Sequence, residues 1–339
     1  MRLRRGAGTL AFTAVLLCAG GCIPSGEGPA PEEDEPQASA SPESPGPVSS
    51  QASTSDSPGL SKALPPPEDT LFGASFQRRG KEDYPEALDR TDQALGLEVV
   101  RVFYPGLPEP WPGVAPDRDL VVSFKVDPLE VLSGRHDAAM QEWFRTAPTD
   151  RRVYWVYWHE PENDSEAGLF EPEDFRLAYA HLAELAQGAG NPDLHATVVL
   201  MSYSLSPESG RDWLDWFPPA DSVDVLAWDV YNRGTGSAFY PPPEELFGPL
   251  EEASSSVGKP FAIAELASPK APGDRGVERA AWITQVGCHL LEADAHFATW
   301  FDFLWNDGKD DYRLRDRPSQ KAWHELSGLQ PGSPRCDGG

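Results

Sequence analysis

Eight short apolar segments recur between residues 71 and 303, and they limit the possible folds more than any other feature of the chain. Their β-branched and aromatic residues are typical of buried strands, and helix-like stretches such as 173–187 and 275–294 lie between them. Repeated βα units of this number, in about 260 residues, predict a (β/α)8 barrel, also called a TIM barrel. The segments are 71–76, 98–104, 120–126, 153–160, 196–203, 223–231, 260–267 and 296–303.

Two further observations bear on this fold. A doubly wound open sheet is the alternative, but the chain has no GxGxxG or GxxxxGK[ST] phosphate loop. The stretch 318–328 has the pattern of a closing helix, with Pro318 in its first turn and Gly328 as its C-cap. We therefore place the barrel domain at residues 70–330, followed by a tail at 331–339.

The first 22 residues have the features of an export signal. Arg2, Arg4 and Arg5 precede an apolar stretch at 6–17 that is too short to span a bilayer comfortably, and small residues then lead to Cys22. This pattern resembles a lipoprotein signal peptide, in which Cys22 becomes the lipidated first residue of the mature chain. An ordinary secretory signal is the alternative, and either one predicts an exported, extracellular or cell-surface protein.

Residues 23–69 are dominated by Pro, Ser, Glu, Ala and Gly, with almost no aromatic or β-branched residues. Such a segment buries too little apolar surface to offset the entropy of ordering it. We expect a disordered linker that holds the barrel away from a membrane. No later segment is apolar and long enough for a transmembrane helix, so we expect membrane contact only through the lipid on Cys22.

Charge and cysteine content narrow the function classes. The formal net charge of −26 argues against a nucleic-acid partner and fits a neutral substrate.

Beyond the signal the chain has only Cys288 and Cys336, which could form one disulfide in an oxidising compartment or remain two free thiols. We expect a monomer.

Two glutamates follow strongly apolar runs at the predicted C-terminal ends of strands, where barrel enzymes carry their active sites. Glu160 ends the segment 153–160, and Glu265 follows the buried run at 261–264. Pro161 predicts an extended backbone at Glu160. Two carboxylates across a pocket are the minimum for glycoside hydrolysis, because one must donate a proton and the other must be ionised. The alternatives are a loop cap at Glu160 and a structural carboxylate with a buried partner at Glu265.

Polar residues near these glutamates allow more than one interpretation. His159 is either a hydrogen-bonded structural residue or a substrate contact. Arg101 and Lys125, near the ends of the second and third strands, either reach the pocket or pair with acidic neighbours. Glu162 and Asp164 lie in the loop after the fourth strand, where we expect them to be solvated.

Tryptophans near the strand ends either fill the barrel or stack on sugar rings. Strand alternation turns only some of them inward, and we select Trp300 as a sugar platform. Trp305 is placed at the mouth of the pocket. The strand tryptophans considered were Trp155, Trp158, Trp228 and Trp300.

Short motifs at four strand ends resemble those of the retaining (β/α)8 glycosidases, and most closely those of glycoside hydrolase family 26, the β-mannanase family. They read HE at 159–160, WDVYN at 228–232, IAEL at 263–266 and TWF at 299–301. The resemblance covers roughly residues 72–326 and rests on the motifs as a set. It implies that Glu160 is the acid/base and that Glu265 is the nucleophile, which forms a covalent glycosyl-enzyme.

The resemblance also implies substrate-binding residues. His159 would orient the acid/base or bond near it, Tyr231 would hydrogen-bond the nucleophile, and Trp300 would lie under the sugar at the cleavage site; Asn232, in the same motif as Tyr231, is a further binding candidate. Family mannanases commonly have an Arg a few residues before HE and an Asn-Gly just after it, and this chain has neither. The substrate class is therefore a polysaccharide or oligosaccharide, with β-mannan first and β-glucan or xylan as alternatives. A sugar-binding barrel without turnover is the alternative from a different class, as is a surface scaffold.

No cofactor or metal is expected. The segment NDGKDD at 306–311 resembles a calcium loop, but its spacing is wrong and no glutamate follows at the required position. No His/Cys cluster has zinc spacing, and no GxSxG elbow accompanies a serine nucleophile.

Overall fold

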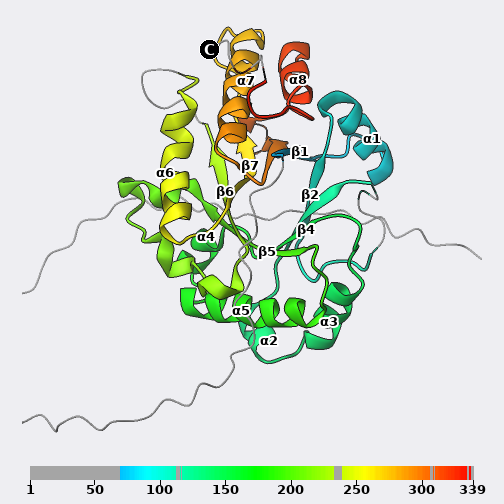
Figure 1. Cartoon of the computed structure of the whole chain (residues 1–339), viewed down its shortest axis with the longest axis vertical. Helices are drawn as coiled ribbons and strands as arrows, with labels where there is room; N and C mark the ends of the chain where they lie inside the picture. Colours follow the sequence, from blue (N-terminus) through cyan, green and yellow to red (C-terminus); the bar gives the residue numbers. More distant parts are fainter. Residues whose placement is uncertain are drawn as a thin grey trace, which may run out of the picture. The chain divides into compact units, whose positions relative to one another are not determined.

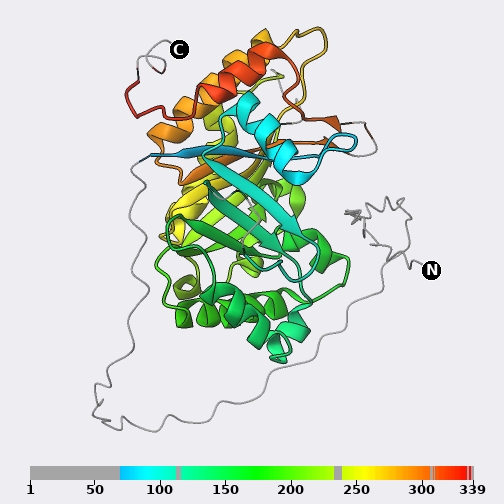
Figure 2. The same ribbon diagram turned by 90° about the vertical axis from the view of Figure 1, so that its right-hand side faces the viewer.

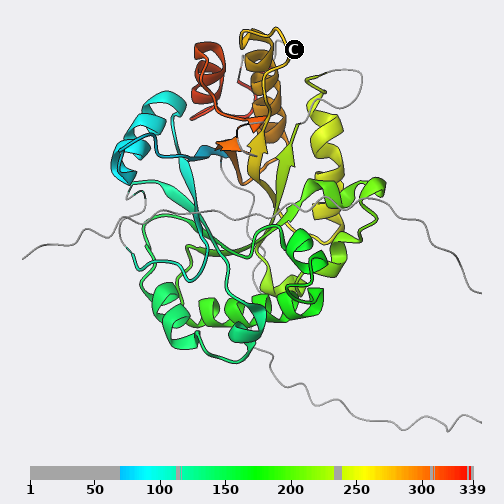
Figure 3. The ribbon, with the colours of Figure 1, turned by 180° about the vertical axis from the view of Figure 1, so that it is seen from behind.

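The computed structural model describes residues 69–111, 115, 117–232, 239–305, 308, 310–333 and 336. Within them, parallel strands close into a barrel in which each strand pairs with the next and β8 pairs with β1. Figures 1 and 3 show the strands at the centre with helices around them. The predicted (β/α)8 barrel is confirmed. The strands are β1 (Leu71–Phe76), β2 (Val99–Tyr104), β3 (Asp119–Phe124), β4 (Val153–Tyr157), β5 (Leu194–Met201), β6 (Val225–Tyr231), β7 (Phe261–Ala267) and β8 (Phe297–Asp302).

The outer layer is less regular than the barrel. The connection from β5 to β6 consists of four 3-10 turns instead of a long helix, and the described residues between β2 and β3 form no helix. Figure 2 shows α7 and α8 side by side on one flank of the barrel, with α1 next to them. The helices are α1 (Tyr84–Leu95), α2 (Pro128–Leu132), α3 (Asp137–Arg145), α4 (Pro161–Glu166), α5 (Pro172–Gly188), α6 (Pro243–Ser256), α7 (Val277–Glu292) and α8 (Arg317–His324). The 3-10 turns are η1 (Ser202–Leu205), η2 (Pro207–Ser209), η3 (Trp213–Trp216) and η4 (Ala220–Ser222), and a two-stranded hairpin, β9 (Leu304–Trp305) with β10 (Asp310–Asp311), follows β8.

Two predicted boundaries are wrong. Strand β4 ends at Tyr157, three residues before Glu160, because the backbone turns sharply after it. Helix α8 ends at His324, and Gly328 does not cap it. Gly328 instead adopts a left-handed φ of 73° in a following turn, where its N–H donates to Glu98. The prediction of Pro318 in the first turn of α8 is confirmed.

The barrel interior is packed with small and medium apolar side chains, and the tryptophans of the strands lie outside it. Trp155 stacks on Tyr179 of α5, and the indole N–H of Trp228 donates to Ser254 of α6. Successive strand residues point to opposite faces, so these tryptophans face the helices while their neighbours face inward. The inward apolar set is Leu71, Val99, Val121, Tyr154, Val156, Val199, Val225, Ala227, Ala262, Ala264 and Phe297.

A β-bulge interrupts the alternation in β7. Trp228 of β6 pairs with Ile263, but the next residue, Asp229, pairs with Glu265, so that Ala264 has no partner on β6. Strict alternation would turn Glu265 outward after the inward-facing Ala264. The extra residue lets both face the interior, as bulges next to active sites often do.

The C-terminal segment is joined to the barrel domain by a disulfide between Cys288 of α7 and Cys336. The alternative of two free thiols is therefore excluded. No helix in the described ranges has the length and hydropathy needed to cross a bilayer. The predicted signal peptide at 1–22 and nearly all of the predicted linker at 23–69 lie outside the described residues, as do positions 306, 307 and 309 of the calcium-like segment.

Candidate active site

Glu160 sits in an unusual turn between β4 and α4. Both Trp158 and Glu160 have a left-handed backbone, with φ of 48° and 51°, so the extended conformation predicted from Pro161 is wrong. Side chains other than glycine rarely adopt this conformation, and such strain clusters at functional sites. The backbone N–H of Glu160 donates to Val199 of β5 at 3.0 Å, and its side chain caps no N–H of α4. The carboxyl group is thus left available for other chemistry.

Glu265 lies inside the barrel on β7 and is 4% exposed. Its Oε1 accepts a hydrogen bond from Nη2 of Arg101 on β2 at 3.1 Å, and its Oε2 accepts one from the hydroxyl of Tyr231 on β6. A guanidinium and a phenol hold this carboxylate from two sides, which fixes its orientation. The contact between Tyr231 and Glu265 is the one that the family resemblance implied.

The two glutamates have contrasting surroundings. Loss of solvent contact raises the pKa of Glu160 to about 8, and the negative charges of Glu265 and Glu162 add to this effect. Lys125 and Arg101 oppose it. Glu160 is therefore protonated at neutral pH, whereas Glu265 has a cationic partner in direct contact. One carboxyl is placed to donate a proton, and the other is held by a guanidinium, which is a pairing that acid-assisted displacement can use.

Asp229 is a third carboxyl in the interior, and sequence reasoning did not select it. Burial, and then the charge of Glu265, raise the pKa of Asp229 well above its usual range. Its two oxygens have no hydrogen-bond partner among the described residues, although Oδ2 lies 3.8 Å from Nη2 of Arg101. Its position in the WDVYN motif, two residues before Tyr231, was the available signal.

Unpartnered polar atoms surround this group of carboxyls. Nε and Nη1 of Arg101 and the hydroxyls of Ser75 and Ser123 are buried without a hydrogen-bond partner in the described part of the chain. Such atoms cost free energy unless water or a ligand satisfies them. Their concentration at one end of the barrel interior marks the place where a polar ligand would be bound.

His159 is a buried, neutral side chain, whereas Lys125 forms an ion pair. The ring of His159 packs edge-on against Phe103 at 5.2 Å, and burial, with the positive charges of Lys125 and Arg101, lowers its pKa well below the usual value. His159 is therefore neutral, and its Nδ1 has no partner among the described residues. Lys125 pairs with Asp164 at 2.8 Å, so the acidic-neighbour interpretation of Lys125 is the one the structure supports.

Of Arg101 and Lys125, Arg101 is the one that contacts a proposed catalytic carboxyl. It is 2% exposed and reaches Glu265 in the barrel interior through a hydrogen bond, while its guanidinium also lies 4.8 Å from the centre of the Phe103 ring. Strand β4 carries no arginine, so the guanidinium of this site comes from β2.

Two predicted substrate contacts are not supported by their positions. Trp300 is 0% exposed, packs edge-on against Trp323 of α8 and donates to the carbonyl of Tyr312, so it cannot lie under a sugar in this conformation. Asn232 is 3% exposed and its side-chain amide donates to Ser268 and to the carbonyl of Phe239. Both predictions failed because these side chains are used to hold the loops and helices around the barrel.

Aromatic residues other than Trp300 form a cluster at the end of β8. Phe301 follows Trp300 and faces the opposite way, and it stacks on Phe303 with 4.4 Å between ring centres. Trp305 is partly exposed and packs edge-on against Phe301, so the predicted position of Trp305 at the mouth agrees with the structure. Tyr231 and Tyr312 complete this group, and Tyr231 links it to Glu265.

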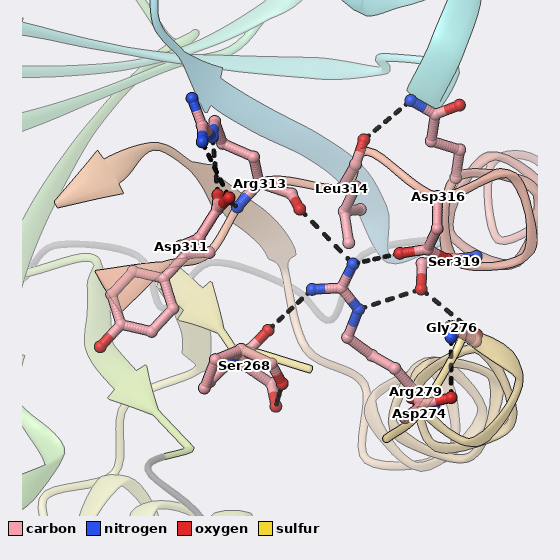
Figure 4. A network of polar contacts seen from close by, with 12 residues as sticks. Ser268, Asp274, Gly276, Arg279, Asp311, Arg313, Leu314, Asp316 and Ser319 are labelled. Atoms are coloured by element: carbon pink, nitrogen blue, oxygen red, sulfur yellow. Dashed lines mark hydrogen bonds and ion pairs between the residues drawn. The ribbon is translucent and has the colours of Figure 1, made fainter. Parts of the chain in front are cut away.

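A buried arginine, Arg279 of α7, connects the loops that follow β7 and β8 (Figure 4). Its guanidinium donates to the carbonyls of Ser268 and Arg313, and it pairs with Asp316 at 2.6 Å. Ser319 of α8 accepts from its Nε. The segment after the β9–β10 hairpin, which carries Trp305, is thereby fixed to the frame of the barrel.

Glu162 is not solvated, contrary to the prediction, whereas Asp164 is partly exposed. The Glu162 side chain is fully buried, and its Oε1 accepts from the N–H of Met201 and the hydroxyl of Ser204. Asp164 accepts from the indole N–H of Trp158 at 2.7 Å as well as from Lys125. The partners of Glu162 lie at the end of β5 and in η1, and those of Asp164 lie directly after β3 and β4. No group of metal-ligating side chains that could hold an ion occurs among the described residues.

Comparisons with known proteins agree with this architecture. No family model matches the chain. The sequence is 25% identical over 171 residues to endoglucanase H of Acetivibrio thermocellus, a match that covers 48% of this chain and 18% of the relative. The chain thus spans less than a fifth of the length of the curated relative that it matches.

Solved structures of glycoside hydrolases share the fold. A family 26 β-mannanase from Bacteroides ovatus aligns with a TM-score of 0.50 and 15% identity over 76% of this chain and 88% of that one. The family 26 protein GH26C from Muricauda aligns with a TM-score of 0.52 and 10% identity, over 76% and 85%. A family 128 endo-β-1,3-glucanase from Amycolatopsis mediterranei, solved with laminaritriose, aligns with a TM-score of 0.50 and 14% identity, over 76% and 100%. The chain shares with these glycoside hydrolases, family 26 members among them, the fold of a (β/α)8 barrel.

Proposed function

We propose that this protein is a retaining β-glycan hydrolase, with Glu160 as its acid/base and Glu265 as its nucleophile. The observation that carries the proposal is the contrast between these two carboxyls at one end of the barrel. Glu160 is held protonated by desolvation and neighbouring negative charge, and Glu265 is held by a guanidinium and a phenol. Glycoside hydrolysis needs such a pair of carboxyls, and a group of aromatic rings lies beside them.

The proposed reaction proceeds in two displacements. Glu265 attacks the anomeric carbon while Glu160 gives its proton to the departing glycosidic oxygen, and a covalent glycosyl-enzyme forms. The ionised Glu160 then takes a proton from water, whose oxygen attacks the same carbon and releases Glu265. Glu265 loses its negative charge when the ester bond to the sugar forms and regains it when that bond breaks. Arg101 and Tyr231, which donate to its two oxygens, are placed to stabilise the carboxylate before attack and as it departs. The retaining mechanism predicts that the two carboxyl groups lie about 5–5.5 Å apart.

The substrate is expected to be a neutral β-linked polysaccharide, with β-mannan first. The motif resemblance to family 26 supports mannan, and the mannanase from Bacteroides ovatus shares the fold. The endoglucanase match and the family 128 endo-β-1,3-glucanase keep β-glucans as direct competitors. The absence of an arginine in β4 separates this chain from the family pattern and makes the choice of polymer the point to test first.

Reducing-sugar release from mannan, mixed-linkage glucan, β-1,3-glucan and xylan tests the proposal. We expect release from at least one polymer by the wild-type domain and none above background by Glu265→Gln. If neither protein releases sugar but the domain is retained on a polymer in affinity electrophoresis, the barrel is a binding protein without turnover. If it neither binds nor cleaves any polymer, the scaffold interpretation is correct.

The chain is further proposed to be exported and anchored through a lipid on Cys22, and to act as a monomer. The support is the sequence pattern at 1–22 and the low complexity of 23–69. Labelling of expressing cells with a radioactive fatty acid should mark the wild type and not Cys22→Ser. Label-free protein in the medium would instead support an ordinary secretory signal, and sedimentation of the barrel domain would give its oligomeric state.

A further inference from the structure

We propose that Glu162 is a positioning residue for Glu160. Its buried carboxyl group fixes the strained turn that presents Glu160 to the barrel interior, and its negative charge helps to keep the proton on Glu160. The role assigned to Glu160 rests on the proposed function, but the anchoring of the turn does not.

The turn from β4 into α4 needs an anchor. Trp158 and Glu160 both have left-handed backbones, and neither is glycine. Each residue in such a conformation costs on the order of 1–3 kcal/mol, so it persists only where surrounding contacts determine it. The two strained residues lie on either side of His159. The second of them, Glu160, is close enough to Glu265 for their charges to interact. Without an anchor, the segment would relax and move the carboxyl of Glu160.

Glu162 supplies the most deeply buried contacts of this segment. It lies in the first turn of α4, two residues after Glu160. Its Oε1 accepts from the backbone N–H of Met201 at 2.8 Å and from the hydroxyl of Ser204 at 3.0 Å. These partners lie at the end of β5 and in η1. Because the N–H of Glu160 is bonded to Val199 of the same β5, the turn is held to this strand on both sides of Pro161.

The other polar residues of α4 are more exposed than Glu162. Glu166 is exposed and pairs with Arg211 at 2.6 Å, and Asn163 accepts from the same guanidinium. Asp164 accepts from Trp158 and Lys125. Of the α4 carboxylates, Glu162 alone is fully buried, and its Oε2 has no hydrogen-bond partner among the described residues. A buried carboxyl with one unsatisfied oxygen is costly for stability alone, which argues for a role in the site.

The charge of Glu162 acts on Glu160 in the pH range where it matters. Burial raises the pKa of Glu162 to about 7, and the pKa of Glu160 is raised to about 8. The negative charge of Glu162, once that group is ionised, opposes the loss of the proton from Glu160. The charged or titratable groups that face Glu160 are Glu162 of α4, Glu265 of β7, Lys125 after β3, Arg101 of β2 and Asp229 of β6, beside the neutral His159.

Two substitutions separate the geometric contribution of Glu162 from its charge. Glu162→Gln keeps an oxygen that can accept from Met201 and Ser204 but carries no charge. Glu162→Ala removes both hydrogen bonds. Glu166→Gln is the matched control, because it removes a carboxylate from the same helix at an exposed position.

For Glu162→Gln we expect kcat at pH 5–6 within about threefold of wild type and a basic limb of the pH–rate profile shifted to lower pH by roughly half a unit to one unit. For Glu162→Ala we expect kcat to fall about 10- to 100-fold with little change in KM, since a displaced acid acts in the chemical step. Glu166→Gln should leave both unchanged. A basic limb that stays in place in Glu162→Gln, or moves equally in Glu166→Gln, would overturn the electrostatic role.

Hydrogen–deuterium exchange of the segment 158–166 tests the anchor without any substrate. Exchange should be faster in Glu162→Ala and close to wild type in Glu162→Gln and Glu166→Gln. Unchanged exchange in a folded Glu162→Ala would overturn the positional role.

If Glu162→Ala does not fold, normal exchange and normal kcat in Glu162→Gln still support the positional role, and loss of kcat at all pH values in Glu162→Gln contradicts it. If the wild type cleaves no glycan, the proposed function fails, and exchange together with carboxyl NMR titration of Glu160 still decides this inference.

Discussion

The two halves of the barrel interior are built from different kinds of side chain. The N-terminal interior, toward the start of the strands, is filled by valine, alanine, leucine, tyrosine and phenylalanine that pack on one another. The C-terminal interior is polar, and its members are Ser75, Arg101, Ser123, Asp229 and Glu265. The first set is mostly apolar and has one buried polar atom without a partner among the described residues, the hydroxyl of Tyr154, whereas the second leaves several buried donors and acceptors without partners. The difference indicates that the chain gains stability at one end and gives some of it up at the other, where a ligand is to be bound.

This division predicts that substitutions at the two ends fail in different ways. A change in the C-terminal interior should reduce activity more than stability, and a change in the N-terminal interior should do the reverse. The predictions below are ordered by the size of the expected effect.

The largest effect is expected for the two proposed catalytic carboxyls. Glu265→Ala should lower kcat by roughly 10⁴-fold, because no nucleophile remains. Sodium azide should restore turnover of an activated aryl glycoside and give a glycosyl azide of inverted configuration. Glu160→Ala with azide should give the azide of retained configuration, since its nucleophile is intact. The same configuration from both variants would contradict the assignment of roles, and NMR of the azide products decides it.

Phe297→Ala tests the opposite end of the barrel. Phe297 is fully buried in the N-terminal interior and packs against Tyr154 with 4.6 Å between ring centres. The cavity left by its removal should cost about 3–5 kcal/mol of unfolding free energy. Urea unfolding measures that loss, and kcat of the folded fraction should stay within about threefold of wild type. A loss of kcat at full folding would show that the two ends are not separable in this way.

The sequence predicted the barrel well because its strands are apolar on both faces. That same property hid which face of each strand points inward. Trp300 and Phe301 are both large aromatic residues, and only the fold shows that Trp300 packs against α8 while Phe301 turns to the interior side. The bulge that brings Glu265 inward left no mark in the segment 260–267, because it depends on pairing with β6.

The two candidate carboxylates were recognisable because each follows an apolar run, but their surroundings were not. Glu162 looked like a solvated loop residue, and its burial depends on Met201 and Ser204, which lie some forty residues later in the chain. Pro161 favours an extended residue before it, yet the docking of the turn on β5 outweighs that local preference at Glu160. Contacts between distant segments decided these points, and no local pattern encodes them.

Arg101→Met is the next substitution in expected size. It removes the hydrogen bond and the positive charge that hold Glu265 while keeping a side chain of similar length. We expect kcat/KM to fall about 100-fold, as for the loss of a preorganised charged donor in other active sites. Arg152→Met is the matched control near the N-terminal end, where Arg152 pairs with Asp119 at 2.7 Å. Equal losses of activity in the two variants would contradict the division of the interior.

The smallest effect is a pH-dependent change in stability on replacing Glu160 by Gln. The folded-state pKa of Glu160 is raised to about 8 from its ordinary value of 4.5, mainly by burial. Below pH 4.5 the group is neutral in both states; as the pH rises toward 8 the unfolded chain ionises it freely while the folded protein resists, so the wild type loses stability across this window. Glutamine carries no such penalty. The Tm of Glu160→Gln should therefore match wild type near pH 4.5 and exceed it by a margin that grows as the pH rises toward 8. Thermal unfolding at both pH values, with Glu166→Gln as the exposed control, measures the difference. A gap that does not widen with pH would mean that Glu160 is not held protonated by the fold, and the assignment of the acid would have to change.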